Sequence, residues 1–181
     1  MTIFKTLATV IIVGLIAGVG FIYSGIYPIG ADQRHSAVTF WILETLRKRS
    51  IANASEDIQV PPLDDPQLLL SGGADYNDMC AGCHLKPGVK ETDMTIGLYP
   101  APPSLMVSPE QHDHDHGEGG HDDPEVIARQ QFWVIKHGVM ASGMAAFGPT
   151  HSDERIWAMV AFLRKLPELN ELQYQILTSR K

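Results

Sequence analysis

The stretch Cys80-Ala81-Gly82-Cys83-His84 contains both cysteines of the chain, two residues apart and followed directly by a histidine. A disulfide and half of a zinc site are the alternatives, but a zinc site needs more ligands and the nearest histidines lie in a distant loop. A thioredoxin-type pair usually follows a strand, and no strand pattern precedes Cys80. Cys-x-x-Cys-His is typical of c-type haem attachment, because this spacing lets both thiols reach the haem vinyl groups. The motif predicts one covalent haem c on Cys80 and Cys83, with His84 as an iron ligand.

The composition limits the classes of protein to which the chain can belong. It has 181 residues, with 14 Lys and Arg against 21 Asp and Glu, and a formal net charge of −7. The length fits one modest domain plus an extension. The acidic balance argues against nucleic-acid binding and suits a basic docking partner. Aromatic residues make up only 8% of the chain, so we expect a large apolar cofactor to fill part of the core.

The amino-terminal region is apolar. Residues 6–31 include no charged side chain, and about 20 apolar residues suffice to cross a bilayer. We therefore expect residues 1–31 to form a transmembrane anchor in the lipid bilayer, with its helix ending at Pro28. A cleaved secretory signal is the alternative, but the apolar part of such a signal is usually about 7–15 residues. Gly14 and Gly18 would let another helix approach closely.

Residues 32–65 are expected to form an amphipathic helix and a linker. The helix is predicted over residues 35–52, because apolar residues recur there at spacings of three and four. These residues are Val38, Trp41, Ile42 and Leu46. The helix either lies at the membrane surface, as Trp41 suggests, or packs on the domain that follows. Prolines and aspartates over residues 57–66 indicate an extended linker.

Residues 66–167 are expected to form an all-α haem domain. Helices are predicted over residues 66–80, 123–138 and 152–166, each beginning at a capping residue. Gly72 lies within the first of them and indicates a close approach by another backbone. Prolines make residues 86–105 irregular. Residues 168–181 are expected to form a polar tail, which could include one more helical turn.

A second candidate iron ligand lies in a loop rich in glycine and methionine at residues 138–149. Met144 follows Gly143, which would let the backbone come near a haem. The methionine thioether is a soft, neutral ligand that favours ferrous over ferric iron. Met140 is the rival candidate, and a methionine that only fills a gap in the core is the remaining alternative.

Residues 111–123 alternate histidines with carboxylates. The histidines are His112, His114, His116 and His121, which suit zinc, copper or nickel. The alternatives are functional metal binding or pH sensing, and a solvated polar loop without a ligand.

These motifs resemble the class I cytochromes c, which are all-helical electron carriers with a single haem. The resemblance covers residues 66–167. Besides the haem motif, it depends on Gly143-Met144-Ala145-Ala146-Phe147, which is similar to the family's Gly-Met-Pro-x-Phe ligand loop with Ala145 where proline is usual. It also depends on Trp157-x-x-x-x-Phe162-Leu163 near the end of the domain, on Pro103-x-Leu105, and on the residues by which the first and last helices cross. The latter are Gly72, Tyr76, Met159 and Phe162.

The resemblance implies a set of site residues and a function. Met144 would be the second iron ligand, the Pro103 carbonyl would accept a hydrogen bond from His84, and Leu105 would pack on the haem. The chain would then transfer single electrons between redox partner proteins and would not be an enzyme. It would act either as a membrane-bound shuttle or as a fixed haem subunit of a larger membrane complex.

Two other classes of function remain open at this point. One is a haem enzyme or gas sensor with an open iron position, for which His137 or His151 would be the distal acid–base residue. The other is a metal-handling protein that uses the histidine-rich loop.

The location follows from the resemblance and not from the charges. In the class I family the haem is attached outside the bacterial cytoplasm, which implies a single-pass inner-membrane protein with its haem domain in the periplasm. The positive-inside rule leans weakly the other way, because Lys5 precedes the apolar stretch while Arg34 and the cations at 47–49 follow it.

Overall fold

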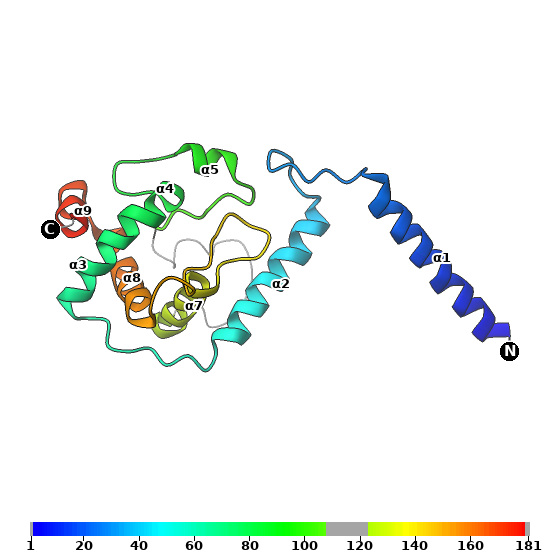
Figure 1. The fold of residues 1–181 in the computed structure, drawn as a ribbon, viewed down its shortest axis with the longest axis horizontal. Helices are drawn as coiled ribbons and strands as arrows, with labels where there is room; N and C mark the ends of the chain where they lie inside the picture. The colour runs from blue at the N-terminus through cyan, green and yellow to red at the C-terminus, as the bar shows by residue number, and fades with distance from the viewer. Residues whose placement is uncertain (1, 108–122, 180–181) are drawn as a thin grey trace. The chain divides into compact units, whose positions relative to one another are not determined.

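The computed structural model describes residues 2–107 and 123–179, which form helices and no strand (Figure 1). The predicted all-α class is therefore confirmed for this part of the chain. The candidate ligands His112, His114, His116 and His121 lie outside the described residues. The chain divides into two compact units, residues 1–33 and 34–181.

The first unit contains one helix, α1 (Thr2–Ser24), of 23 residues. None of these residues is buried, and α1 alone among the described helices is long and apolar enough to span a membrane, a test that a signal sequence would also pass. The helix stops before Gly25, whose φ of +63° is left-handed, and not at Pro28 as predicted. A left-handed glycine is a common helix terminator, which accounts for the earlier end.

The second unit contains the other described helices. In chain order they are α2 (Ala37–Ser55), α3 (Pro66–Asp75), the π-helix η1 (Tyr76–Cys80), α4 (Ala81–His84), α5 (Asp93–Gly97), α7 (Pro124–His137), α8 (Asp153–Lys165), the 3-10 helix η2 (Leu166–Glu168) and α9 (Glu171–Thr178). The side chains of Asp65, Asp123 and Ser152 accept backbone hydrogen bonds at the starts of α3, α7 and α8. These are N-caps, as the sequence predicts.

Helix α3 crosses α8 at the centre of this unit (Figure 1). A Cβ atom on Gly72 would overlap the carbonyl oxygen of Ala158, so the two backbones touch there. A Cβ atom on the neighbouring Gly73 would lie 2.7 Å from the Leu177 carbonyl oxygen of α9. The close approach predicted at Gly72 is confirmed, and Gly73 adds a second one.

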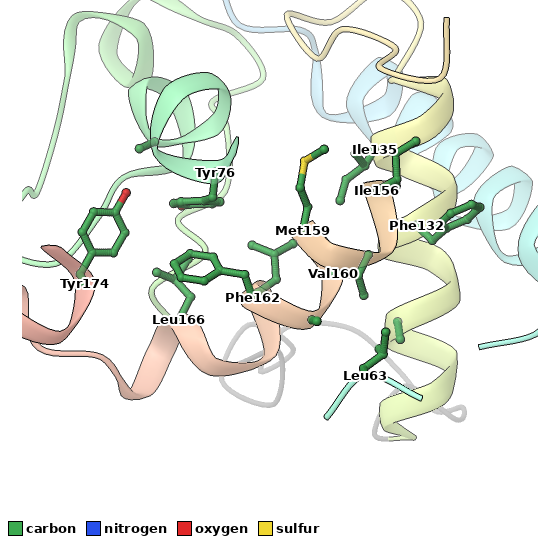
Figure 2. Close-up of a cluster of buried hydrophobic side chains, with 14 residues drawn as sticks. Leu63, Tyr76, Phe132, Ile135, Ile156, Met159, Val160, Phe162, Leu166 and Tyr174 are labelled. Atoms are coloured by element: carbon green, nitrogen blue, oxygen red, sulfur yellow. The ribbon is translucent and has the colours of Figure 1, made fainter. Parts of the chain in front are cut away.

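The core is built around α8, with η1 and α9 packed on one part of it and α7 on another (Figure 2). The ring centroids of Tyr76 and Phe162 are 5.4 Å apart, and Tyr174 of α9 presents its edge to Tyr76 at 6.4 Å. Nearer the amino terminus of α8, Trp157 stacks on Phe132 of α7 with the ring centroids 4.1 Å apart. Protein side chains alone make these contacts, so this region is a complete scaffold.

Helix α2 packs on α7 through its carboxyl-terminal half. Ile51 and Ser55 are buried there, and the Arg129 guanidinium of α7 donates to the Glu56 carbonyl oxygen at 3.2 Å. Of the two alternatives that the sequence left open, packing on the domain is what the structure shows for this half of the helix.

Three segments of the second unit differ from the prediction. The helix expected over residues 66–80 changes to a π-helix at Tyr76, and residues 93–97 form a short helix in a region expected to be irregular. Residues 171–178 form α9, which is longer than the single helical turn that the sequence allowed in a polar tail. The aromatic ring of Tyr174 is buried against α3 and α8, and this long-range contact stabilises a helix that looks polar in the sequence.

Candidate haem-binding site

The cysteine motif lies at the end of one continuous helical segment, where α3 leads into η1 and then α4. The Ala81 N–H donates to the Tyr76 carbonyl oxygen, a π-type bond of a kind frequent at functional sites. The Tyr76 hydroxyl donates to the Leu85 carbonyl oxygen at 2.6 Å, and the Thr92 hydroxyl donates to the Gly82 carbonyl oxygen at 2.7 Å. Two side chains outside the motif therefore hold its backbone in place.

Cys80 and Cys83 are both free thiols and both half-buried. Burial, with smaller contributions from Asp75 and Cys83, raises the pKa of Cys80 to about 12. Cys80 is therefore a protonated thiol at neutral pH. Among residues 2–107 and 123–179, no group of three or more His, Cys, Asp or Glu side chains is arranged to hold a metal ion. Cys80 and Cys83 therefore have no further zinc ligands beside them in this part of the chain.

Asp75 is a neighbour of the motif that the sequence does not reveal. Its side chain is buried and accepts two hydrogen bonds from Arg155 of α8, from Nε at 2.6 Å and from Nη2 at 2.7 Å. This bidentate ion pair joins the end of α3 to α8 just before the motif begins. Its partners lie 80 positions apart, so no local pattern indicates the pair.

The loop that follows the motif holds the ring of His84. Its Nδ1 lies 2.8 Å from the Pro103 carbonyl oxygen, and because a carbonyl only accepts, Nδ1 carries the hydrogen and Nε2 keeps its lone pair. Burial lowers the pKa of His84, and the bond to Pro103 opposes this only in part. The Leu105 N–H donates to the His84 carbonyl oxygen at 3.2 Å. His84 is thus a neutral, oriented imidazole with Nε2 available to a metal, and its partner is the one that the resemblance implies.

Met144 lies in a loop that folds back on the end of α7. The Val139 N–H donates to the Met144 carbonyl oxygen at 3.1 Å, and the Met144 N–H donates to the Ser142 hydroxyl at 3.1 Å. Gly138 ends α7 with a φ of +67°, and a Cβ atom there would lie 2.7 Å from the Met144 carbonyl oxygen, so the turn requires glycine. Met144 packs against the core, whereas Met140 is 97% exposed.

Several apolar side chains near the domain core are only partly covered by protein. Four of them pack on the buried core and keep part of their surface exposed, namely Cys80 of the motif, Leu105, Met106 and Met144. The donor set consists of two free thiols, a neutral imidazole and a thioether, which is the set that a haem c needs. A partly open apolar surrounding also suits a large apolar macrocycle, so the residues present fit this group.

His137 and His151 were the candidates for a distal acid–base residue. The ring of His137 packs on Trp133 with a centroid separation of 4.9 Å. The Nδ1 of His151 lies 2.8 Å from the Thr150 hydroxyl, and its ring stands edge-on to Phe147 at 5.5 Å. The contacts described for both rings are with these neighbours and not with the cysteine motif.

The comparison with known proteins identifies the family of residues 67–163. Residues 67–163 match the family described as Cytochrome C oxidase, cbb3-type, subunit III. The match covers more than half of the 181 residues and includes the motif, Pro103 and Met144. No curated protein and no solved structure matches the chain. The chain therefore belongs to this family of class I cytochromes c and is a haem-binding, electron-transfer cytochrome.

Proposed function

We propose that this cytochrome is anchored in the bacterial inner membrane by α1, presents residues 34–181 to the periplasm, and passes single electrons between redox partner proteins. The family supports haem c and electron transfer. The length and the exposed apolar surface of α1 support a single-pass anchor. In the class I family, haem is attached outside the bacterial cytoplasm, which supports the periplasmic location.

Four residues of this chain would hold one haem c. Cys80 and Cys83 would each add their S–H across one vinyl double bond, with sulfur bonding to one carbon and hydrogen to the other. His84 would bind the iron through Nε2, and Met144 would bind it through sulfur. When bound, the group supplies one iron that alternates between the ferrous and ferric states.

The hydrogen bond between His84 and Pro103 is the observation that carries this proposal. It fixes both the orientation and the tautomer of the ring, so that Nε2 is the nitrogen available to iron. Met144, as a neutral and soft ligand, would favour the ferrous state and raise the reduction potential. Two protein ligands leave no position open to a small molecule, which suits an electron carrier and not an enzyme.

The matched pair Met144→Ala and Met140→Ala tests this assignment. We expect Met144→Ala to keep the attached haem, lose the sulfur–iron charge-transfer band of the oxidised protein and lower the reduction potential. Met140→Ala should change neither property, because that side chain is almost fully exposed. Loss of the band in Met140→Ala would move the ligand to that residue. A wild-type ferric haem that is high-spin and binds cyanide at once would instead support an enzyme or sensor with an open iron position.

A second candidate is a fixed haem subunit of a larger oxidoreductase complex. The matched family is described as a subunit of an oxidase, and a Cβ atom on Gly14 or Gly18 of α1 would meet only open space. Such a glycine ridge lets another transmembrane helix approach closely. In gently solubilised membranes, a fixed subunit would migrate with the complex on a native gel stained for haem, and Gly14→Leu with Gly18→Leu would release it. If the haem band instead migrates as a single chain of 19.9 kDa, the protein is a shuttle and not a fixed subunit.

A further inference from the structure

Helix α2 has a second apolar side besides the one that packs on α7. Val38, Trp41, Ile42 and Leu46 are exposed by 67%, 66%, 51% and 64%. They recur at spacings of three and four and so lie along one side of the helix, which we call the outward stripe. The buried Ile51 falls on the other side. A contiguous exposed apolar patch of this kind usually marks a site of interaction with a protein or a membrane.

Positive charge flanks the outward stripe at both ends. Arg34 precedes α2, and Arg49 continues the side of the stripe towards the carboxyl end of the helix. Glu44 is paired with Arg47 at 2.6 Å and with Lys48 at 3.6 Å, whereas no ion pair of Arg34 or Arg49 occurs within the described residues. The chain as a whole carries a net charge of −7, so this flank is a local exception. An anionic surface would be repelled by most of the protein and attracted here.

The position of α2 in the chain indicates which surface that is. Residues 25–36 join the end of α1 to the start of α2. A segment of this length spans at most about 40 Å when fully extended. If α1 crosses the bilayer, α2 cannot move far from the point at which the chain leaves it.

We propose that the outward stripe lies in the headgroup region of the periplasmic leaflet of a bilayer containing anionic lipid. The inference rests on the proposed membrane anchor. Aliphatic side chains and a tryptophan at the level of the headgroups, with arginines at either end to reach the phosphates, are the pattern of an interfacial helix. One side of α2 would thus bind the membrane while the other holds the domain.

This arrangement would orient the haem site relative to the membrane. Helix α2 is fixed on α7 by Ile51 and by the bond from Arg129 to Glu56. Just before α2 begins, the ring of His35 contacts Tyr99 with the centroids 5.3 Å apart. Tyr99 opens the proline-rich segment whose later carbonyl orients His84. Docking of the stripe would therefore set the height and tilt of the site above the bilayer.

Spin labels on single introduced cysteines test the inference in the full-length haem-loaded protein. The protein is reconstituted into vesicles of phosphatidylcholine with phosphatidylglycerol. We expect a label at Ile42→Cys to collide more often with oxygen, which partitions into lipid, than with an aqueous nickel chelate. A matched label at Leu172→Cys, where the native side chain is 66% exposed on α9, should show the opposite ratio. Adding Trp41→Ser and Leu46→Ser should reverse the ratio at position 42 without changing the haem spectrum.

Each other outcome overturns the inference in a distinguishable way. If the labels at positions 42 and 172 are equally accessible to nickel while the protein stays in the vesicle fraction, the stripe does not contact lipid. The membrane anchor is then unaffected. Protection of position 42 that appears only in native membranes assigns the stripe to a protein partner. Release of the protein from the vesicles by high salt rejects the anchor itself, and the inference fails with it.

Discussion

The α3–α8 crossing and the side that carries the cysteine motif adjoin each other but differ in what completes them. At the crossing, Tyr76 and Phe162 are almost fully buried, and the backbones touch. On the motif side, Cys80 and Leu105 each rest on the core with one side and keep the other partly exposed. The crossing is complete as protein, whereas the motif side has an apolar surface that a haem would cover.

Tyr76 joins the two regions and shows how one positions the other. Its ring is packed at the crossing, while its hydroxyl donates to the Leu85 carbonyl oxygen just after the motif. The buried ring cannot shift without disturbing the core, so the hydroxyl holds the motif backbone at a fixed place. The protein core therefore sets the geometry of the motif, and the hydrogen bond from Tyr76 transmits it to the site.

The largest effect is expected from Cys80→Ala combined with Cys83→Ala. We expect complete loss of haem from the denatured chain on a haem-stained gel, because both thioether bonds are gone. We also expect a domain with weakened near-ultraviolet circular dichroism, because the motif side would lack the group that fills it. A double variant that keeps native circular dichroism and thermal stability would break the comparison, since the motif side would then be complete as protein.

The next largest effect is expected at the crossing itself. Gly72→Ala should lower the free energy of unfolding by about 3 kcal/mol, because the new methyl group overlaps the Ala158 carbonyl oxygen and neither backbone can move freely. Gly82→Ala is the matched control, since a Cβ atom there meets nothing within 4 Å. It should change stability by less than about 1 kcal/mol, in the stabilising direction. Urea unfolding of the haem-loaded proteins measures both values, and equal losses would contradict the difference between the regions.

A smaller effect is expected from the ion pair that joins the regions. Arg155→Ala leaves the buried carboxylate of Asp75 without its bidentate partner and should cost roughly 2 kcal/mol. This is below the cost for a fully buried pair, because the Arg155 side chain is 44% exposed and water can replace part of it. Lys165→Ala, which removes an exposed pair with Glu168, should cost about 0–0.5 kcal/mol. Indistinguishable midpoints in urea for the two variants would show that Asp75 is solvated without Arg155.

The sequence predicts those parts of this fold that follow local rules. The N-caps Asp65, Asp123 and Ser152 lie where the composition of short windows indicates, and the haem motif is recognisable from five residues. The close approach at Gly72 could be predicted, because glycine destabilises a helix interior unless its small size is needed. The ion pair of Asp75 with Arg155 could not be predicted, because its partners meet only once α3 and α8 have crossed.

Helices α5 and α9 were only partly predictable from the sequence. Each begins with a reciprocal capping box, Thr92 with Thr95 and Asn170 with Gln173, so a local signal existed. The threonine pair and the asparagine–glutamine pair are weaker signals than serine with glutamate, and both segments are short. Burial of Tyr174 against the crossing is what fixes α9, and burial depends on the finished fold.

The smallest effect is expected at Tyr174, whose hydroxyl donates to the Asn77 side chain of η1 at 3.1 Å and so ties α9 to the start of the motif side. Burial, with contributions from Cys80 and Asp78, raises the pKa of Tyr174 from 10.0 to about 12. Burial is the largest cause and remains when the Cys80 sulfur becomes a thioether. Because the folded pKa lies above the unfolded one, folding favours the neutral phenol. Its stabilisation is complete below about pH 10 and is lost as the pH rises towards about 12.

Tyr174→Phe isolates this contribution. At neutral pH the variant should be less stable than wild type by about 1 kcal/mol, the usual value of one hydrogen bond. The gap should then narrow between about pH 10 and about pH 12, because only the wild type has this phenol to ionise. Tyr76, whose pKa burial also raises, is present in both proteins and cancels in the difference. Unfolding free energies in urea across this range measure the gap. A constant gap would mean that the phenol titrates alike in the folded and unfolded chains, and that α9 does not shield it where the two regions meet.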